Sequence, residues 1–152
     1  MSAISCDYCK IMVIKNIFGV EMQKDAVEKS KMTAMGINII EGDAFDLPFK
    51  DSYFDLVFTS GVLIHIHPRD LKKAMAEIVR VSKKYIWGFE YFDLKCRGIE
   101  YSGHEDCLWA NDFCGLFLKY FSGLELVKRR QFKRLDNGKS DEMYLIKKLQ
   151  IK

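Results

Sequence analysis

The chain lacks the features that mark cofactor-cradling loops, membrane spans and disulfide-rich folds. Its ten glycines never occur as Gly-x-Gly, so the usual loop that cradles a phosphate or cofactor is missing. No apolar stretch approaches the roughly 18 residues that a membrane span requires, and no basic segment followed by an apolar one marks a secretory signal. Five cysteines, an odd number, favour free thiols in a reducing compartment. We therefore expect a cytoplasmic protein with no membrane partner.

Charge and cysteine spacing narrow the choice of ligands further. The net charge of +3 is too small to argue for nucleic acid, and we expect none. The basic cluster Lys128-Arg129-Arg130 with Lys133 and Arg134 is typical of a solvated strand edge, although an acidic acceptor would also suit it. Cys6 and Cys9 have metal or redox spacing, but no second Cys-x-x-Cys pair accompanies them, so we expect no metal.

Apolar periodicity predicts alternating strands and helices in one domain of 152 residues, without repeats or linkers. Leu71, Ala74, Met75, Ile78 and Val79 form an amphipathic stripe in a helix that Pro68 opens and that Arg80, Lys83 and Lys84 end. Asp93 to Asp106 reads as a loop. The predicted strands are 17–21, 37–41, 53–59, 85–92, 124–130 and 143–148, and the other predicted helices are 23–35, ended by Gly36, and 109–121.

This order, β-α-β-β-α-β-α-β-β, predicts an α/β fold with a mainly parallel sheet. The last two strands form an antiparallel hairpin across Asp136-Asn137-Gly138. Residues 53–59 are apolar on both faces, as in a central parallel strand. Glu21 ends one predicted strand and Asp43 follows the next. Since ligands in open α/β sheets bind beyond the carboxyl ends of strands, we expect both carboxylates in one crevice.

Several motifs between residue 17 and about residue 147 carry a family resemblance. Gly19-Val20-Glu21 and Glu41-Gly42-Asp43-Ala44 are moderately specific, whereas the run from Ser60 to Pro68 and Glu90-Tyr91-Phe92 are more particular. Lys84-Tyr85-Ile86 and Trp109-x-Asn111-Asp112-Phe113 also match. The chain resembles a class I S-adenosylmethionine-dependent methyltransferase, and more narrowly the methylases associated with pseudaminic acid biosynthesis. The resemblance implies a Rossmann-like methyltransferase fold.

The sequence departs from this family pattern at its beginning. Family members open with a strand, a Gly-x-Gly-type loop and a first helix, and this sequence starts after them, which predicts an N-terminally truncated fold. Residues 1–16 are then a remnant of the first helix, or Lys10 to Ile14 replace the first strand. Because unpaired strand edges are costly, we expect these residues or a second copy of the chain to cover the gap.

The resemblance implies a set of cofactor-binding residues. Glu21 would accept hydrogen bonds from the two ribose hydroxyls, with Met22 beside it, and Asp43 would receive the adenine amino group. The alternative for Glu21 is a solvated acid that opens a helix. The alternative for Asp43 is a turn residue that bonds its own backbone. The other predicted members are Ala44 and Phe45 beside the adenine, although Phe45 also suits the core, and Ser60, Gly61 and Val62 beside the methionine part.

Glu90 and His65 are the candidate catalytic groups of the methyl transfer. Histidine titrates near neutrality and suits a base, but a packed histidine explains His65 equally well, and a structural ion pair nearly explains Glu90. Tyr91 and His104 are candidates for contacting the methyl acceptor. His67 reads as exposed.

These residues are compatible with two alternative functions. One is an S-adenosylmethionine-dependent methyltransferase that acts on a small acceptor such as a sugar-pathway intermediate. The other is a catalytically inactive, truncated relative that serves as a binding or assembly module. The missing glycine loop separates them, since losing two or three backbone hydrogen bonds of about 1 kcal/mol each weakens cofactor binding by one to two decades or more.

Overall fold

The computed structural model describes residues 16–33, 36–101, 104–134 and 139–150. The chain divides into two compact units, Met1–Asp43 and Ala44–Lys152, and each is described by itself. That the two units make one domain stays a prediction. The turn predicted at residues 136–138, the segment from Lys10 to Ile14 and the pair Cys6 and Cys9 lie outside the described residues. No helix in the described ranges is long and apolar enough to cross a membrane.

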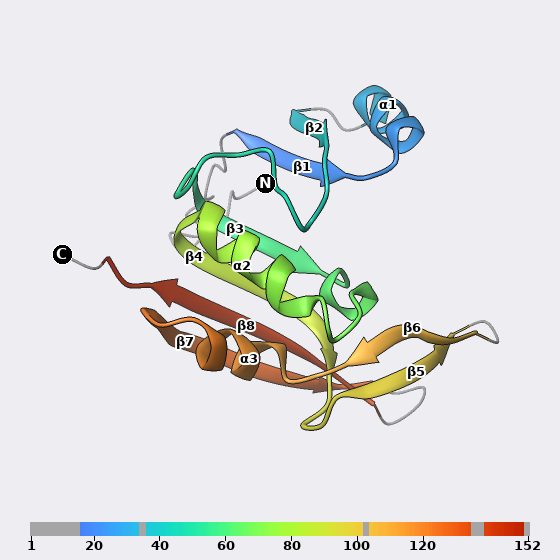
Figure 1. The fold of residues 1–152 in the computed structure, drawn as a ribbon, viewed down its shortest axis with the longest axis vertical. Coiled ribbons are helices and arrows are strands. Elements are labelled where there is room, and N and C mark those ends of the chain that lie inside the picture. Colours follow the sequence, from blue (N-terminus) through green and yellow to red (C-terminus); the bar gives the residue numbers. More distant parts are fainter. Residues whose placement is uncertain (1–15, 34–35, 102–103, 135–138, 151–152) are drawn as a thin grey trace, which may run out of the picture. The chain divides into compact units, whose positions relative to one another are not determined.

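The first unit is a β-α-β arrangement. Strand β1 (Ile17–Glu21) pairs in parallel with β2 (Ile37–Glu41), and helix α1 (Lys24–Thr33) connects them (Figure 1). Both strands have the predicted bounds, and the helix begins one residue later than expected. Gly36 has φ +81°, the left-handed conformation that favours glycine after a helix.

The second unit contains a four-stranded sheet in the order β3-β4-β8-β7. Its strands are β3 (Phe54–Ser60), β4 (Ser82–Phe92), β7 (Leu124–Lys133) and β8 (Ser140–Lys148). Strand β3 pairs in parallel with β4, whereas β8 is antiparallel to both β4 and β7. The predicted C-terminal antiparallel pair is therefore present. The described sheet is mixed, so a mainly parallel sheet is not confirmed.

Two helices cover one face of this sheet, as Figure 1 shows. They are α2 (Leu71–Val81) and α3 (Phe113–Tyr120), and the short 3-10 helix η1 (Leu63–His65) precedes them. The predicted α2 stripe is buried at Leu71, Ala74, Met75 and Ile78 and packs against sheet residues such as Ile86 and Ile146. Each large apolar side chain buried there stabilises the fold by about 1.5–3 kcal/mol.

The structure corrects both ends of the α2 prediction. Pro68 lies in a turn ahead of the helix, where the N–H groups of Asp70 and Leu71 both bond to the carbonyl of His67. Lys83 and Lys84 belong to β4, because Ser82 already has extended backbone and ends the helix.

The region between β4 and α3 also differs from its prediction. It contains an antiparallel hairpin, β5 (Arg97–Tyr101) and β6 (His104–Ala110), where we expected a loop. Trp109 therefore lies in a strand and not in a helix. Helix α3 begins at Phe113 because the side chain of Asp112 accepts the N–H of Gly115 at 2.8 Å and so caps the helix.

Strand β3 is not packed on both faces in the described part of the chain. Val57 contacts the core, but Leu56 is 43% exposed and Phe58 is 58% exposed. The expected central position is wrong for the described sheet, because β3 stands at the end of the strand order and the helices cover only one face.

Candidate cofactor and acceptor site

The carboxyl ends of β1 and β2 bring the first predicted cofactor residues together. Glu21 and Glu41 are register partners in the parallel pair, and the N–H of Gly42 donates to the carbonyl of Glu21 at 3.1 Å. The turn that carries Asp43 therefore lies beside Glu21. Parallel pairing was the premise of this prediction, and it holds in the first unit.

The chemistry of this strand end favours ligand groups that donate hydrogen bonds. The Glu21 carboxylate accepts the N–H of Gln23 at 2.8 Å through Oε1, which orients the side chain. Ionised carboxylates have only acceptor sites, so Glu21 and Asp43 suit ligand groups that donate, such as ribose hydroxyls and an exocyclic amine. Met22 is 70% exposed and offers an apolar surface next to Glu21.

Ala44 and Phe45 open the second unit, and a network that α2 supplies holds the segment that follows them. Lys73 Nζ lies 5.5 Å from the centre of the Phe45 ring. The Arg80 guanidinium donates to the carbonyls of Leu47 and Phe49 at 2.9 and 2.6 Å. The Glu77 carboxylate accepts the N–H of Leu47 at 2.8 Å, and its hydrogen bond from Arg80 lowers the pKa of that carboxyl.

The predicted loop at Ser60, Gly61 and Val62 follows β3 directly. Gly61 has φ +63°, and an added Cβ would have only Ile64 Cδ1 near it, at 3.9 Å. The requirement for glycine is therefore the left-handed backbone and not lack of space. The Gly61 N–H donates to the carbonyl of Phe89 at 2.9 Å, which ties the loop to β4.

Glu90 lies beneath this loop and is only 2% exposed. Its Oε1 accepts the N–H of Val62 at 3.3 Å, so the carboxylate faces the loop backbone. Burial raises the pKa of the Glu90 carboxyl, and hydrogen bonds from Thr59 and from the N–H groups of Val62, Leu63 and Ile64 oppose the rise. A group so enclosed is held more like a structural acid than like a base open to an acceptor, and its predicted catalytic role stays a prediction.

The remaining predicted residues are spread over three elements. His65 ends η1 and is exposed, so it can meet a ligand. Tyr91 follows Glu90 on β4 and so points to the other side of the strand, where the guanidinium of Arg134 lies 4.8 Å from its ring centre. His104 begins β6, and its side chain lies outside the described part. The structure therefore does not bring Glu90 and Tyr91 to one face.

His67 is exposed, as predicted, and its ring stands edge-on to Trp109 with centroids 5.1 Å apart. Among the described cysteines, Cys96 is an exposed thiol and Cys114 a buried one, and burial raises the pKa of the Cys114 thiol to about 12. In the described ranges no group of three or more histidine, cysteine or acidic side chains could hold a metal.

The sequence analysis missed a buried ionic cluster behind α3. Arg129 donates to Glu142 Oε1 at 2.6 Å and to Asp112 Oδ1 at 2.8 Å, and Glu142 is almost fully buried. Arg129 thus points to the helix-covered face, unlike its neighbours in the basic cluster of β7, Lys128 and Arg130, which are exposed. The sequence does contain Glu142 and Arg129 in the two strands that were predicted to pair. Only the observed register of these strands shows that the two side chains meet.

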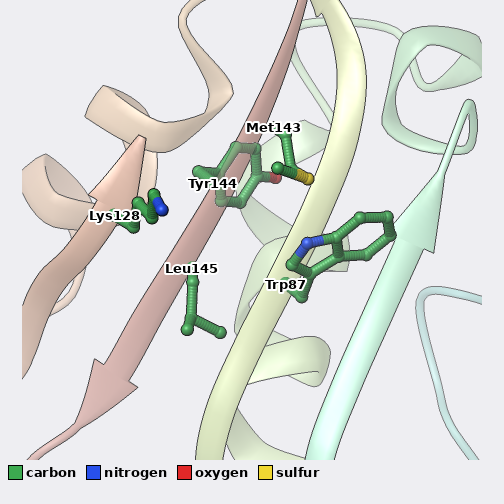
Figure 2. Close-up of a pocket in the computed structure, with 5 residues that line it drawn as sticks. All are labelled: Trp87, Lys128, Met143, Tyr144 and Leu145. Carbon is green, nitrogen blue, oxygen red and sulfur yellow. The ribbon is translucent and has the colours of Figure 1, made fainter. Parts of the chain in front are cut away.

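A hollow on the other face of the sheet contains none of the predicted site residues. Figure 2 shows it between β4, β7 and β8, lined by Trp87, Lys128, Met143, Tyr144 and Leu145, with a volume of about 180 Å³. Its walls are mainly apolar, and it lies on strands that carry no predicted cofactor residue.

Comparison with known families identifies the fold that these elements build. The family model described as a methyltransferase domain matches residues 2–85, more than half of the chain. The chain belongs to the methyltransferase domain family. The match includes β1, β2 and β3, with Glu21, Asp43 and the Ser60–Val62 loop. The narrower resemblance to pseudaminic acid methylases and the N-terminal truncation stay predictions.

Curated relatives match only part of their own length. A demethylmenaquinone methyltransferase of Thermobifida fusca is 34% identical over 80 residues, which are 53% of this chain and 29% of that protein. A putative methyltransferase of Encephalitozoon cuniculi is 39% identical over 62 residues, which are 36% of this chain and 30% of that protein. The chain therefore matches about three tenths of each relative.

Solved structures support the Rossmann-like methyltransferase fold. An S-adenosylmethionine-dependent methyltransferase of Methanosarcina mazei has a TM-score of 0.70 at 15% identity, over 90% of this chain and 83% of its own. A Burkholderia thailandensis 1,6-didemethyltoxoflavin N1-methyltransferase, solved with its substrate and S-adenosylhomocysteine, has a TM-score of 0.68 at 13% identity, over 89% of this chain and 62% of its own. At these identities the two structures inform the fold of this chain.

Proposed function

We propose that this chain binds S-adenosylmethionine and transfers its methyl group to a small acceptor. The observation that carries the proposal is the parallel pairing of β1 and β2 in a chain of the methyltransferase domain family, because it sets Glu21 beside the turn that carries Asp43. Two acceptor-only side chains at one strand end are suited to the donor groups of a nucleoside.

The predicted cofactor residues occur in both units, and the roles proposed for them are those that the family resemblance implies. In the first unit, Glu21 binds the ribose hydroxyls, Met22 packs beside it, and Asp43 takes the adenine amine. In the second unit, Ala44 and Phe45 provide backbone and an apolar wall. Ser60, Gly61 and Val62 contact the amino-acid part through a backbone whose left-handed glycine holds it in shape.

The bound cofactor supplies an activated methyl group on its sulfonium. What the chain adds is orientation of an acceptor and exclusion of water, which can account for most of the rate enhancement. His65 is exposed at the end of η1 and is the group we assign to orient or deprotonate an acceptor. Tyr91 and His104 remain our candidates for contacting it.

The acceptor is proposed only as a small molecule, and a sugar-pathway intermediate is one candidate. Three structural neighbours differ in what they act on or assemble with: one is a methyltransferase bound to 1,6-didemethyltoxoflavin, one is the [4+2]-cyclase SpnF, and one is a putative methyltransferase in complex with the Haloferax volcanii Trm112 activator. Each covers this chain at 13–14% identity, so it informs the fold and not the reaction. A second copy of this chain stays a proposed partner.

Turnover tests the proposal directly. The purified chain is incubated with S-adenosylmethionine and a panel of small hydroxyl- and amine-bearing acceptors, and the S-adenosylhomocysteine released is quantified. We expect release that depends on one acceptor class and falls at least 10-fold in His65→Ala. Cofactor binding without release for any acceptor would instead support an inactive binding module.

A further inference from the structure

A buried polar cluster joins three strands directly beneath the Ser60–Val62 loop. Thr59 of β3 and Tyr144 of β8 are both register partners of Gly88 on β4, so their side chains lie on the same face. Glu90 is two residues along β4 on that face. Glu90 and Tyr144 are 2% and 1% exposed, so the cluster is closed to solvent.

Gly88 makes room for this cluster. A Cβ on Gly88 would stand 2.1 Å from Tyr144 Cζ and 2.3 Å from Tyr144 Oη. The Tyr144 ring therefore extends from β8 toward β4, as Figure 2 shows, and stands against Gly88. Among the described residues its hydroxyl has no hydrogen-bond partner of good geometry, which is unusual for a buried phenol, and Thr59 and Glu90 are polar groups that act on it.

The two oxygens of Glu90 have different surroundings. Oε1 accepts the N–H of Val62, whereas Oε2 is buried without a partner, like Tyr144 Oη. An ionised carboxylate would leave Oε2 charged and without a hydrogen bond in a site closed to solvent, which is more costly than a neutral group there. Burial also raises the pKa of the carboxyl, and this effect outweighs the hydrogen bonds from Thr59 and the loop N–H groups that lower it.

We propose that Glu90 is a positioning residue that, as a neutral acid protonated on Oε2, holds the Ser60–Val62 loop through Oε1. The inference deepens the proposed function and rests on it for the meaning of the loop. It assigns Glu90 a role behind the site, acting through the loop backbone, in place of proton transfer to or from an acceptor.

Replacement by glutamine separates the two roles. A glutamine amide has the shape of a neutral carboxylic acid, with one acceptor for the Val62 N–H and one donor where the acid carries its proton. Glu90→Gln should therefore preserve the loop, whereas a base would be lost. Glu90→Leu keeps similar bulk but has no acceptor, so it should release the loop.

The test measures amide hydrogen exchange by NMR in the chain without cofactor. We expect the Val62 N–H of Glu90→Leu to exchange at least about 10-fold faster than in the unsubstituted chain, the loss of roughly one hydrogen bond. Glu90→Gln should restore protection to within about 3-fold. The Ile86 amide within β4 serves as a reference, because a general loss of stability accelerates both amides alike.

A second measurement reads the proton itself. The infrared spectrum of the unsubstituted chain should retain a protonated carboxyl band at a pH above 4.5, the ordinary pKa of the group, and that band should disappear in Glu90→Gln. Absence of that band, or exchange at Val62 that is as fast in Glu90→Gln as in Glu90→Leu, would overturn the inference. Both readouts need no cofactor, so a failure to bind S-adenosylmethionine would count against the proposed function alone.

Discussion

The ring of Tyr144 occupies the space where a side chain at Gly88 would stand, with Cζ 2.1 Å from the position of a Cβ. Tyr144 lies on the helix-covered face, where its ring packs against Phe117 at a centroid distance of 6.1 Å. The absence of a side chain at Gly88 thus admits a buried aromatic ring whose hydroxyl is influenced by Thr59 and Glu90.

Gly88→Ala should destabilise the fold by about 1–3 kcal/mol, because the added methyl overpacks a rigid core. Urea unfolding followed by circular dichroism measures the change. Adding Tyr144→Leu removes the clashing ring atoms, so the double variant should lose less than the sum of the single changes. Full additivity, or an unchanged midpoint for Gly88→Ala, would contradict the contact.

Arg129 and Arg130 are neighbours on β7 with opposite surroundings, and they give a matched pair of substitutions. Arg129→Met leaves the buried Glu142 without its cation and should cost about 3 kcal/mol or more. Arg130→Met removes an exposed cation that lies 5.1 Å from the Phe132 ring centre and should cost less than about 1 kcal/mol. Thermal unfolding compares the two variants. Equal losses would show that Arg129 is not the partner of Glu142.

The pH dependence of stability should change in Glu90→Gln. Burial raises the folded-state pKa of Glu90 above its ordinary value of 4.5, so the folded state binds its proton more tightly than the unfolded state. The stability that this residue contributes is complete below the unfolded-state pKa and is lost as the pH rises through the folded-state pKa. Glutamine does not titrate.

The melting temperature of Glu90→Gln, relative to the unsubstituted chain, should therefore rise as the pH increases through that window. Differential scanning calorimetry at a series of pH values measures the difference. A relative melting temperature that falls with rising pH would mean that Glu90 is stabilised in its charged form.

The sequence predicted those helices and strands whose buried apolar residues recur at the period of a helix or a strand. The stripe of α2 from Leu71 to Ile78 follows the 3.6-residue period and is buried as expected. The β1 and β2 bounds also follow from short apolar runs that end in an acid. The hairpin of β5 and β6 was missed because its residues alternate weakly. Asp112 was the available signal for the start of α3, since an aspartate before an apolar run caps a helix.

Register decided what local pattern could not. Whether Arg129 joins a solvated edge or a buried pair depends on which face of β7 it occupies, and a bulge between Leu126 and Lys128 shifts the pairing with β8. The burial of Glu90 likewise depends on residues distant in the sequence, the backbone of Val62 to Ile64 and the side chain of Tyr144. The sequence predicted Glu90 near the end of a strand. It could not distinguish a side chain that contacts an acceptor from one that lies under the Ser60–Val62 loop.

Isothermal titration calorimetry with S-adenosylmethionine tests the central claim, that Glu21 binds the nucleoside at the end of β1. Glu41→Ala is the matched control, since Glu41 is the register partner of Glu21 and carries the same charge. We predict binding heat for the unsubstituted chain and for Glu41→Ala, and a loss of at least about 100-fold in affinity for Glu21→Ala, as expected when two hydrogen bonds to a charged group are removed. No heat at millimolar cofactor, or equal affinities for the two variants, would contradict the account.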